Sequence, residues 1–111
     1  MQGKELHDFI VEKLDDIKAK DIAVVDVRGR SDITDCMIVC SGTSNRHVRS
    51  IAERVGEEMR HAGIMPFGID GDKDSEWVLV DLGEVMVHVM MEEARDRYQL
   101  EKLWRSAEQA A

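Results

Sequence analysis

Two kinds of apolar spacing alternate along the chain, and this alternation restricts the fold more than any other feature of the sequence. Some stretches repeat their apolar residues every three or four positions, as helices do, whereas short apolar runs between them are typical of strands. The helical stretches are 3–19, 44–62 and 91–104, and the strand runs are 21–27, 36–40, 67–69, 77–82 and 85–90. The order α-β-β-α-β-β-β-α predicts an α/β fold, in which helices pack on a mixed five-stranded sheet.

The connections between these elements predict some of the strand directions. The strand–helix–strand unit within residues 36–69 indicates a parallel crossover. Gly83 and Glu84 separate the last two strand runs, and a Gly-X pair in this position favours a type II′ hairpin, which makes those strands antiparallel. With no linker or repeat, we expect one domain over residues 1–111, with 106–111 as a disordered tail.

The chain is acidic, with a formal net charge of -8 from 23 acidic and 15 basic side chains. Residues 70–111 hold eleven of the acids against five bases. Bare nucleic acid and anionic membranes repel such a chain, because each phosphate contact needs a Lys or Arg. The charge therefore favours a basic protein as partner, although an acidic surface can also serve solubility alone. No apolar leader or membrane-length run occurs, so we expect a cytoplasmic protein.

Cys36 and Cys40 are the two cysteines, and both fall in one predicted strand. Their spacing puts them on one face but roughly 13 Å apart at ~3.3 Å per residue. That separation is too long for a disulfide, and no histidine stands nearby at zinc-ligand spacing. We expect two buried thiols of the core.

The loop 41–47 lies between a strand and a helix N-terminus, where free backbone N–H groups can hold an anion. It lacks the glycine and lysine patterns of nucleotide-binding loops. A helix capped by Ser44 or Thr43, and ended by Gly63, explains the same residues without any ligand.

Four aspartates could form a metal site, but their pattern favours an acidic surface turn. They are Asp70, Asp72, Asp74 and Asp81. A calcium loop would need a central glycine and a final glutamate, and both are absent. Together with the turn at Gly42, these carboxylates are weakly similar to the Mg²⁺ site of a nucleotidyltransferase, which provides a rival enzymatic hypothesis. We predict no metal, cofactor or enzymatic activity.

The histidines offer no catalytic arrangement by their spacing. His88 stands inside the apolar run VMVHVM, where a hydrogen-bonded histidine at the core or sheet edge is expected.

Three aromatic residues lie in the acidic third of the chain, namely Trp77, Tyr98 and Trp104. Aromatic residues surrounded by charge are typical of protein interfaces, but they can equally complete a small core.

Three segments resemble the signature stretches of the ribosomal silencing factors, also called the Iojap-like family. They are DIAVVDVRGRSDITDCMIVCSGTSNRH, EWVLVDLGEVMVHVM and RYQLEKLW, in the family's order and at similar spacing. The resemblance covers roughly residues 3–105 and implies a nucleotidyltransferase-like fold. It also implies a bacterial, cytoplasmic protein that binds the large ribosomal subunit through large-subunit protein fourteen, a basic ribosomal protein. Such a protein blocks joining of the small subunit and represses translation under nutrient limitation.

The resemblance also implies a partner-binding surface. Carried over by position, its residues are Trp77, Asp81, Leu82, Met91, Tyr98, Leu100, Glu101, Lys102 and Leu103. Strand alternation places Trp77 and Asp81 on one face of the sheet and Leu82 on the other. We expect little or no direct contact with nucleic acid, no membrane contact, and a monomer or weak homodimer.

Overall fold

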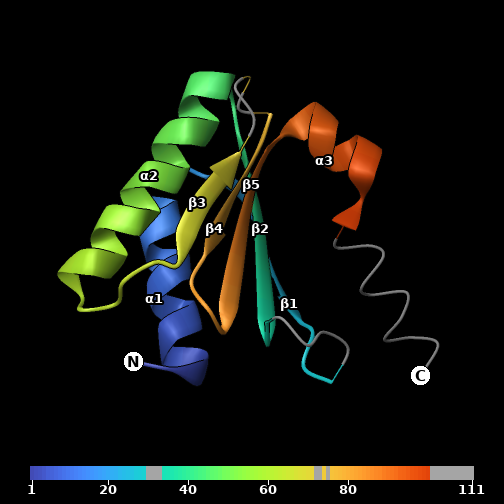
Figure 1. Cartoon of the computed structure of the whole chain (residues 1–111). Helices are drawn as coiled ribbons and strands as arrows, with labels where there is room; N and C mark the ends of the chain where they lie inside the picture. Colours follow the sequence, from blue (N-terminus) through green and yellow to red (C-terminus); the bar gives the residue numbers. More distant parts are fainter. Residues whose placement is uncertain (30–33, 72–73, 75, 101–111) are drawn as a thin grey trace.

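The computed structural model describes residues 1–29, 34–71, 74 and 76–100. Its element order confirms the predicted alternation of helices and strands (Figure 1). The elements are α1 (Gly3–Asp16), β1 (Lys20–Asp26), β2 (Cys36–Gly42), α2 (Asn45–His61), β3 (Gly68–Gly71), β4 (Trp77–Asp81), β5 (Val85–Met91) and α3 (Glu92–Tyr98). The α/β prediction is therefore correct.

The five strands form one mixed sheet in the order β1-β2-β5-β4-β3. Strands β2 and β5 are parallel, and every other neighbouring pair is antiparallel. Strand β3 consequently runs parallel to β2, as the strand–helix–strand pattern predicts, but β5 and β4 lie between them. The β4–β5 hairpin is also confirmed: Gly83 has φ +87° and the Leu82 N–H donates to the Val85 carbonyl at 2.9 Å.

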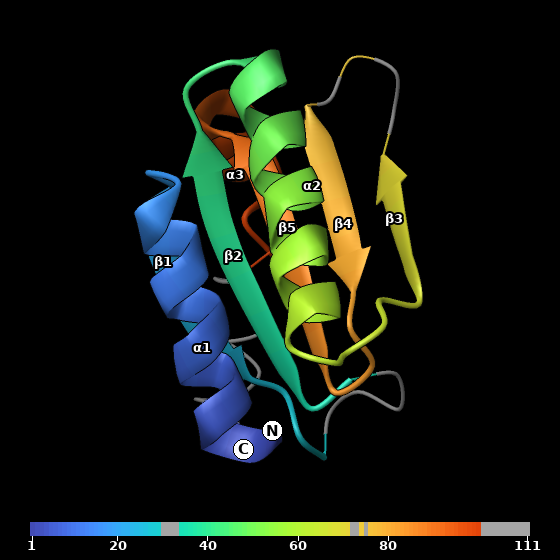
Figure 2. The same cartoon turned by 90° about the vertical axis from the view of Figure 1, so that its left-hand side faces the viewer.

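Helices α1 and α2 lie on the same face of the sheet and enclose the main core (Figure 2). Their apolar faces meet alternate residues of the central strands, which point to this side of the sheet. The fully buried members include Ile10, Leu14, Ile38, Ile51, Met59 and Val87. None of the described helices is long and apolar enough to cross a membrane.

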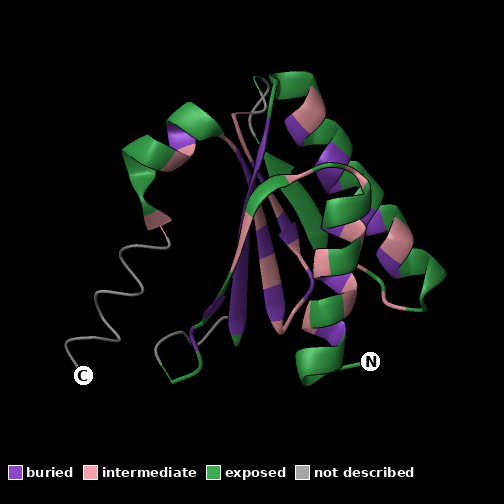
Figure 3. Ribbon diagram, turned by 180° about the vertical axis from the view of Figure 1, so that it is seen from behind, coloured by how far each residue is buried: buried purple, intermediate pink, exposed green. Residues whose placement is uncertain are grey.

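The other face of the sheet carries α3, which leaves the end of β5 and turns back across the sheet (Figure 3). Ala94 of α3 is fully buried there beside Met90 of β5 and Val39 of β2. The side chain of Arg95 donates to Ser41 Oγ at 3.1 Å, which fixes α3 to the end of β2. A second, smaller cluster of apolar residues thus holds α3 in place.

The prediction of one continuous C-terminal helix over residues 91–104 is wrong. Helix α3 ends at Tyr98, and Gln99 takes a left-handed conformation with φ 52° and ψ 44°. A left-handed residue closes a helix because the chain leaves the helical path at that point. Residues 101–104 and the expected tail 106–111 lie outside the described residues.

Helix α2 is capped by Ser44, one of the two predicted N-cap residues, whose side chain accepts from the His47 N–H at 3.0 Å. His47 also links the two helices of the main layer. Its Nδ1 accepts from the Thr43 N–H at 2.9 Å, and its Nε2 lies 3.1 Å from the carbonyl oxygen of Ile17. Ile17 caps the end of α1, so the start of α2 and the end of α1 share one imidazole ring.

Candidate functional site

An aromatic cluster lies where β4 and β5 meet α3, on the sheet face opposite α1 and α2. Leu79 pairs with His88 in the antiparallel register, and Trp77 stands two residues before Leu79 on the same side. The indole ring of Trp77 lies 4.9 Å from the Tyr98 ring and 5.8 Å from the His88 ring, centroid to centroid. We call Trp77, Leu79, His88 and Tyr98 the aromatic face.

His88 is held neutral within the aromatic face. Trp77 Nε1 donates to His88 Nδ1 at 3.0 Å, so this nitrogen must be unprotonated. Burial lowers the pKa of His88 from 6.5 to about 4, because a charged imidazolium loses hydration there. This confirms the expectation of a hydrogen-bonded structural histidine, and it argues against His88 as a base that titrates near neutral pH.

Tyr98 projects from the last turn of α3 and is 51% exposed. One edge of the aromatic face is therefore available to a partner. The guanidinium carbon of Arg97 lies 5.3 Å from the centre of the Tyr98 ring, and Arg97 also forms an ion pair with Glu76, the residue before β4. These contacts fix the end of α3 beside β4. A tyrosine presented in this way provides both an apolar ring and a hydroxyl group for a protein contact.

A shallow hollow of about 390 Å³ adjoins the aromatic face. Trp77, Leu79 and His88 form part of its lining, and Asp70 and Gly71 of β3 complete it. Leu79 belongs to this surface but was not among the residues predicted for it. Alternation with Trp77 was the signal that could have identified it, because residues two apart in a strand share a face.

The structure places the predicted partner-binding residues in several environments. Trp77 and Asp81 are partly buried on the side of the aromatic face, and Met91 contacts both apolar clusters. Leu82 belongs to the main core on the helical side and is only 5% exposed, as strand alternation predicted. Leu100 packs against the cluster beneath α3. Glu101, Lys102 and Leu103 lie outside the described residues.

Asp81, one of the carboxylates of the nucleotidyltransferase hypothesis, lies far from the turn at Gly42. Gly42 pairs with Met91 at the last residue of β5, whereas Asp81 pairs with Met86 near its beginning. Five residues of strand separate the two positions, or about 16 Å at ~3.3 Å per residue. Asp81 Oδ1 instead accepts from the Gly83 N–H at 3.0 Å. Asp72 lies outside the described residues, and the described part of the chain holds no group of three potential metal ligands.

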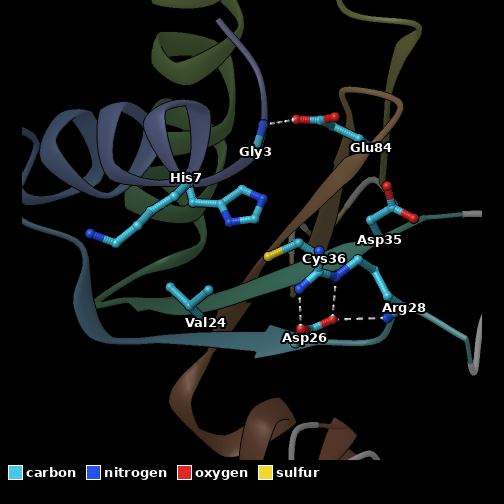
Figure 4. Close-up of a pocket in the computed structure, with 9 residues that line it drawn as sticks. Gly3, His7, Val24, Asp26, Arg28, Asp35, Cys36 and Glu84 are labelled. Carbon is cyan, nitrogen blue, oxygen red and sulfur yellow. Dashed lines mark hydrogen bonds and ion pairs between the residues drawn. The ribbon is translucent and has the colours of Figure 1, made fainter.

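A second cavity, of about 250 Å³, lies between α1 and the start of β2 (Figure 4). Charged groups surround this cavity, but those that form the hydrogen bonds drawn in the figure bond to other residues of its lining. Arg28 forms two side-chain hydrogen bonds with Asp26, and Glu84 accepts from the backbone N–H of Gly3 at 2.8 Å. Cys36 also lines the cavity, and burial raises its pKa to about 11, so its thiol is protonated near neutral pH.

Cys40 is likewise buried, and burial raises its pKa to about 12. Both cysteines are free thiols on the side of the main core. The prediction of two buried core thiols is confirmed. Neither cysteine has the low pKa that a nucleophilic or metal-binding thiol requires.

Comparisons with known proteins agree with the fold and cover nearly the whole chain. A family model described as "Ribosomal silencing factor during starvation" matches residues 2–111. The ribosomal silencing factor of Haemophilus influenzae is 48% identical over 99 residues, which covers 89% of this chain and 97% of that protein. A mouse protein named "Mitochondrial assembly of ribosomal large subunit protein 1" is 34% identical over 100 residues, covering 87% of this chain and 44% of that protein.

Solved structures show the same fold at similar levels of identity. A Chromobacterium violaceum protein superposes with a TM-score of 0.89 at 41% identity, covering 94% of this chain and 87% of that one. A Bacillus halodurans protein gives a TM-score of 0.81 at 35% identity, covering 92% and 95%. The chain belongs to the family of ribosomal silencing factors.

Proposed function

We propose that this protein binds the large ribosomal subunit through large-subunit protein fourteen and thereby blocks joining of the small subunit. In this role it represses translation when nutrients are limited. The observation that carries the proposal is the family match over residues 2–111, whose description names ribosomal silencing during starvation. The mouse relative, named for assembly of the mitochondrial large ribosomal subunit, supports the choice of subunit.

The aromatic face is the surface that we assign to this contact. The Trp77 and Tyr98 rings lie 4.9 Å apart at an interplanar angle of 48°, and the exposed Tyr98 ring extends the surface toward solvent. Aromatic side chains dominate the energy of protein interfaces because they bury a large rigid area. The net charge of -8 favours a basic ribosomal protein over RNA as the direct partner, since opposite charge raises the association rate.

The proposed action requires no chemistry, and we infer that the protein is not an enzyme. Two particles that need the same patch exclude each other, so occupancy alone prevents subunit joining. A complex of micromolar to nanomolar affinity, about -8 to -12 kcal/mol, suffices for this purpose. The separation of Gly42 from Asp81 along the sheet supports this inference, because a phosphoryl-transfer site would need them together.

Sedimentation of purified subunits tests the proposal directly. Adding the protein to dissociated subunits before raising Mg²⁺ should reduce the peak of joined ribosomes and place the protein with the large subunit. The Tyr98→Ala variant should leave subunit joining closer to its uninhibited level. Full subunit joining at saturating protein, or migration with the small subunit alone, would contradict the proposal.

The identity of the partner protein needs a separate measurement. Isothermal titration of isolated protein fourteen with this chain should show binding that weakens as salt increases, because the two proteins carry opposite charge. Sedimentation equilibrium of the chain by itself tests our further expectation of a monomer or weak homodimer. A large subunit that binds the chain equally well without protein fourteen would contradict the proposed partner but leave the subunit assignment intact.

A further inference from the structure

The two edges of the sheet differ in how well they are protected against pairing with another strand. Strand β1 forms one edge and β3 the other. The β1 edge contains a register irregularity between Lys20 and Ala23, and Asp21 has a positive φ of 50°. Bulges and charged residues are the usual means by which proteins prevent strand addition at an edge. The β1 edge has both.

The β3 edge instead carries exposed apolar side chains. Met65 is 72% exposed, Phe67 is 79% exposed and Ile69 is 38% exposed. Ile69 lies in β3, Phe67 forms the bend directly before it, and Met65 lies two residues earlier in the chain. We call Met65, Phe67 and Ile69 the apolar edge. Among the described residues β3 pairs with β4 alone, and all four of its residues are exposed. An edge strand of this kind has backbone N–H and C=O groups on its outer side that can pair with a further strand.

Contacts at the base of the apolar edge hold it in a defined position. The Phe67 N–H donates to the Asp81 carbonyl at 2.9 Å. Ring atom Cε2 of Phe67 lies 2.9 Å from the point where a side chain would begin at Gly83, and Ile69 Cδ1 lies 3.1 Å from the equivalent point at Gly56 of α2. The glycines therefore leave room for Phe67 and Ile69, while most of the Phe67 ring remains uncovered.

The charge around this edge indicates the chemistry of its partner. Residues 53–84 contain nine acidic and three basic side chains, or -6 of the total net charge of -8. Asp70 is exposed in β3 and points to the face opposite Ile69, because successive residues of a strand alternate. A second copy of the same acidic edge would be repelled. A partner strand with basic residues on one face and apolar residues on the other complements both Asp70 and the apolar edge.

We propose that β3 accepts an extended segment of another protein, in which basic and apolar residues alternate, as a sixth strand of the sheet. The apolar residues of the segment contact Met65, Phe67 and Ile69, and its basic residues lie beside Asp70. Backbone hydrogen bonds supply part of the affinity in such complexes, and alternate side chains supply the specificity. Since β3 has four residues, the complex is weak, with a dissociation constant of roughly 10–100 µM.

Fluorescence anisotropy with a labelled peptide of about nine residues, alternating Lys and Val, tests this proposal without any ribosome. The peptide should bind, and a Glu-Val peptide of the same length should not. Methylation of alternate backbone nitrogens in the Lys-Val peptide should abolish binding, because it removes the donors for strand pairing while retaining charge. Equal binding of the acidic or the methylated peptide, or no binding at all, would overturn the proposal.

Variants of the protein locate the contact. Phe67→Ser should weaken binding at least ~10-fold, and Asp70→Asn should weaken it by about 3-fold and reduce its salt dependence. Val24→Ser, which removes an exposed apolar residue from the protected β1 edge, is the matched control and should bind normally. An unaffected Phe67→Ser variant would overturn the proposal, as would a concentration-dependent dimer that Phe67→Ser disrupts, because a second copy would then be the partner.

Discussion

The indole N–H of Trp77 donates to His88 Nδ1 across 3.0 Å, which fixes this histidine in the tautomer that carries its proton on Nε2. The two residues lie on neighbouring strands and are two residues out of direct register, since Trp77 pairs with Met90 and Leu79 with His88. The hydrogen bond therefore runs diagonally across the sheet. It holds the indole plane in the position from which the ring contacts Tyr98.

Stability should fall as the pH decreases from 6.5 toward 4, in part because of His88. The folded state lowers the pKa of His88 to about 4, whereas the unfolded chain keeps about 6.5. Between these values the unfolded state binds more protons, so acid favours unfolding, by up to about 3 kcal/mol. Urea unfolding at several pH values measures this effect. His88→Gln, whose amide oxygen can still accept from Trp77, should show a smaller loss over the same range, and identical pH profiles would contradict the prediction.

Tyr98 and Trp77 should respond differently to replacement by alanine. Tyr98 is half exposed, so Tyr98→Ala should lower the melting temperature by no more than about 3 °C while weakening binding to the large subunit. Trp77→Ala should weaken binding and also destabilise the fold by roughly 2–4 kcal/mol, since it removes a partly buried ring and the partner of His88. Thermal melts combined with subunit binding separate the two effects. A Tyr98→Ala variant with normal binding would exclude Tyr98 from the interface.

Leu82 should affect folding rather than binding, although the family resemblance places it in the interface. Its side chain is in the main core, so Leu82→Ala should cost about 2–5 kcal/mol of stability. Subunit binding per folded molecule should remain unchanged. A titration of the large subunit, with the protein concentration corrected for the fraction that is folded, measures this. Reduced affinity in a fully folded Leu82→Ala sample would restore Leu82 to the interface.

Gly42 should not tolerate a side chain. A Cβ atom there would lie 2.8 Å from Val48 Cγ2 and 2.9 Å from the Val48 backbone nitrogen, in the first turns of α2. Gly42→Ala must therefore displace the start of α2, and we expect a loss of at least ~2 kcal/mol in urea unfolding. Gly68→Ala serves as the control, because a Cβ atom at that position meets nothing within 4 Å. Its stability should stay within about 0.5 kcal/mol of the wild type.

Local features of the fold could be predicted from the sequence, whereas long-range pairings could not. Apolar periodicity identified α1 and α2, and the side chain of Ser44 caps α2 as expected. The parallel pairing of β2 with β5 joins segments about fifty residues apart, and no local pattern specifies it. The end of α3 at Gln99 was also missed, because neither glycine nor proline marks that position.

In the candidate site, too, local features could be predicted from the sequence and long-range contacts could not. Alternation correctly separated Trp77 from Leu82, because a strand has a period of two residues. The Trp77–His88 hydrogen bond depends on the register between β4 and β5, and the contact with Tyr98 depends on where α3 turns back. Neither the hydrogen bond nor the ring contact can be predicted from the spacing of these residues along the chain.

Strand β5 stands at the centre of the sheet, yet it is the last of the five strands in the chain. During synthesis, β2 and β4 have no common neighbour until residue 91 has left the ribosome, so the sheet cannot close before that point. A truncated product that lacks β5 would leave apolar strands exposed and be open to proteolysis or aggregation. The cell would thus obtain a folded molecule only from nearly complete translation of its message.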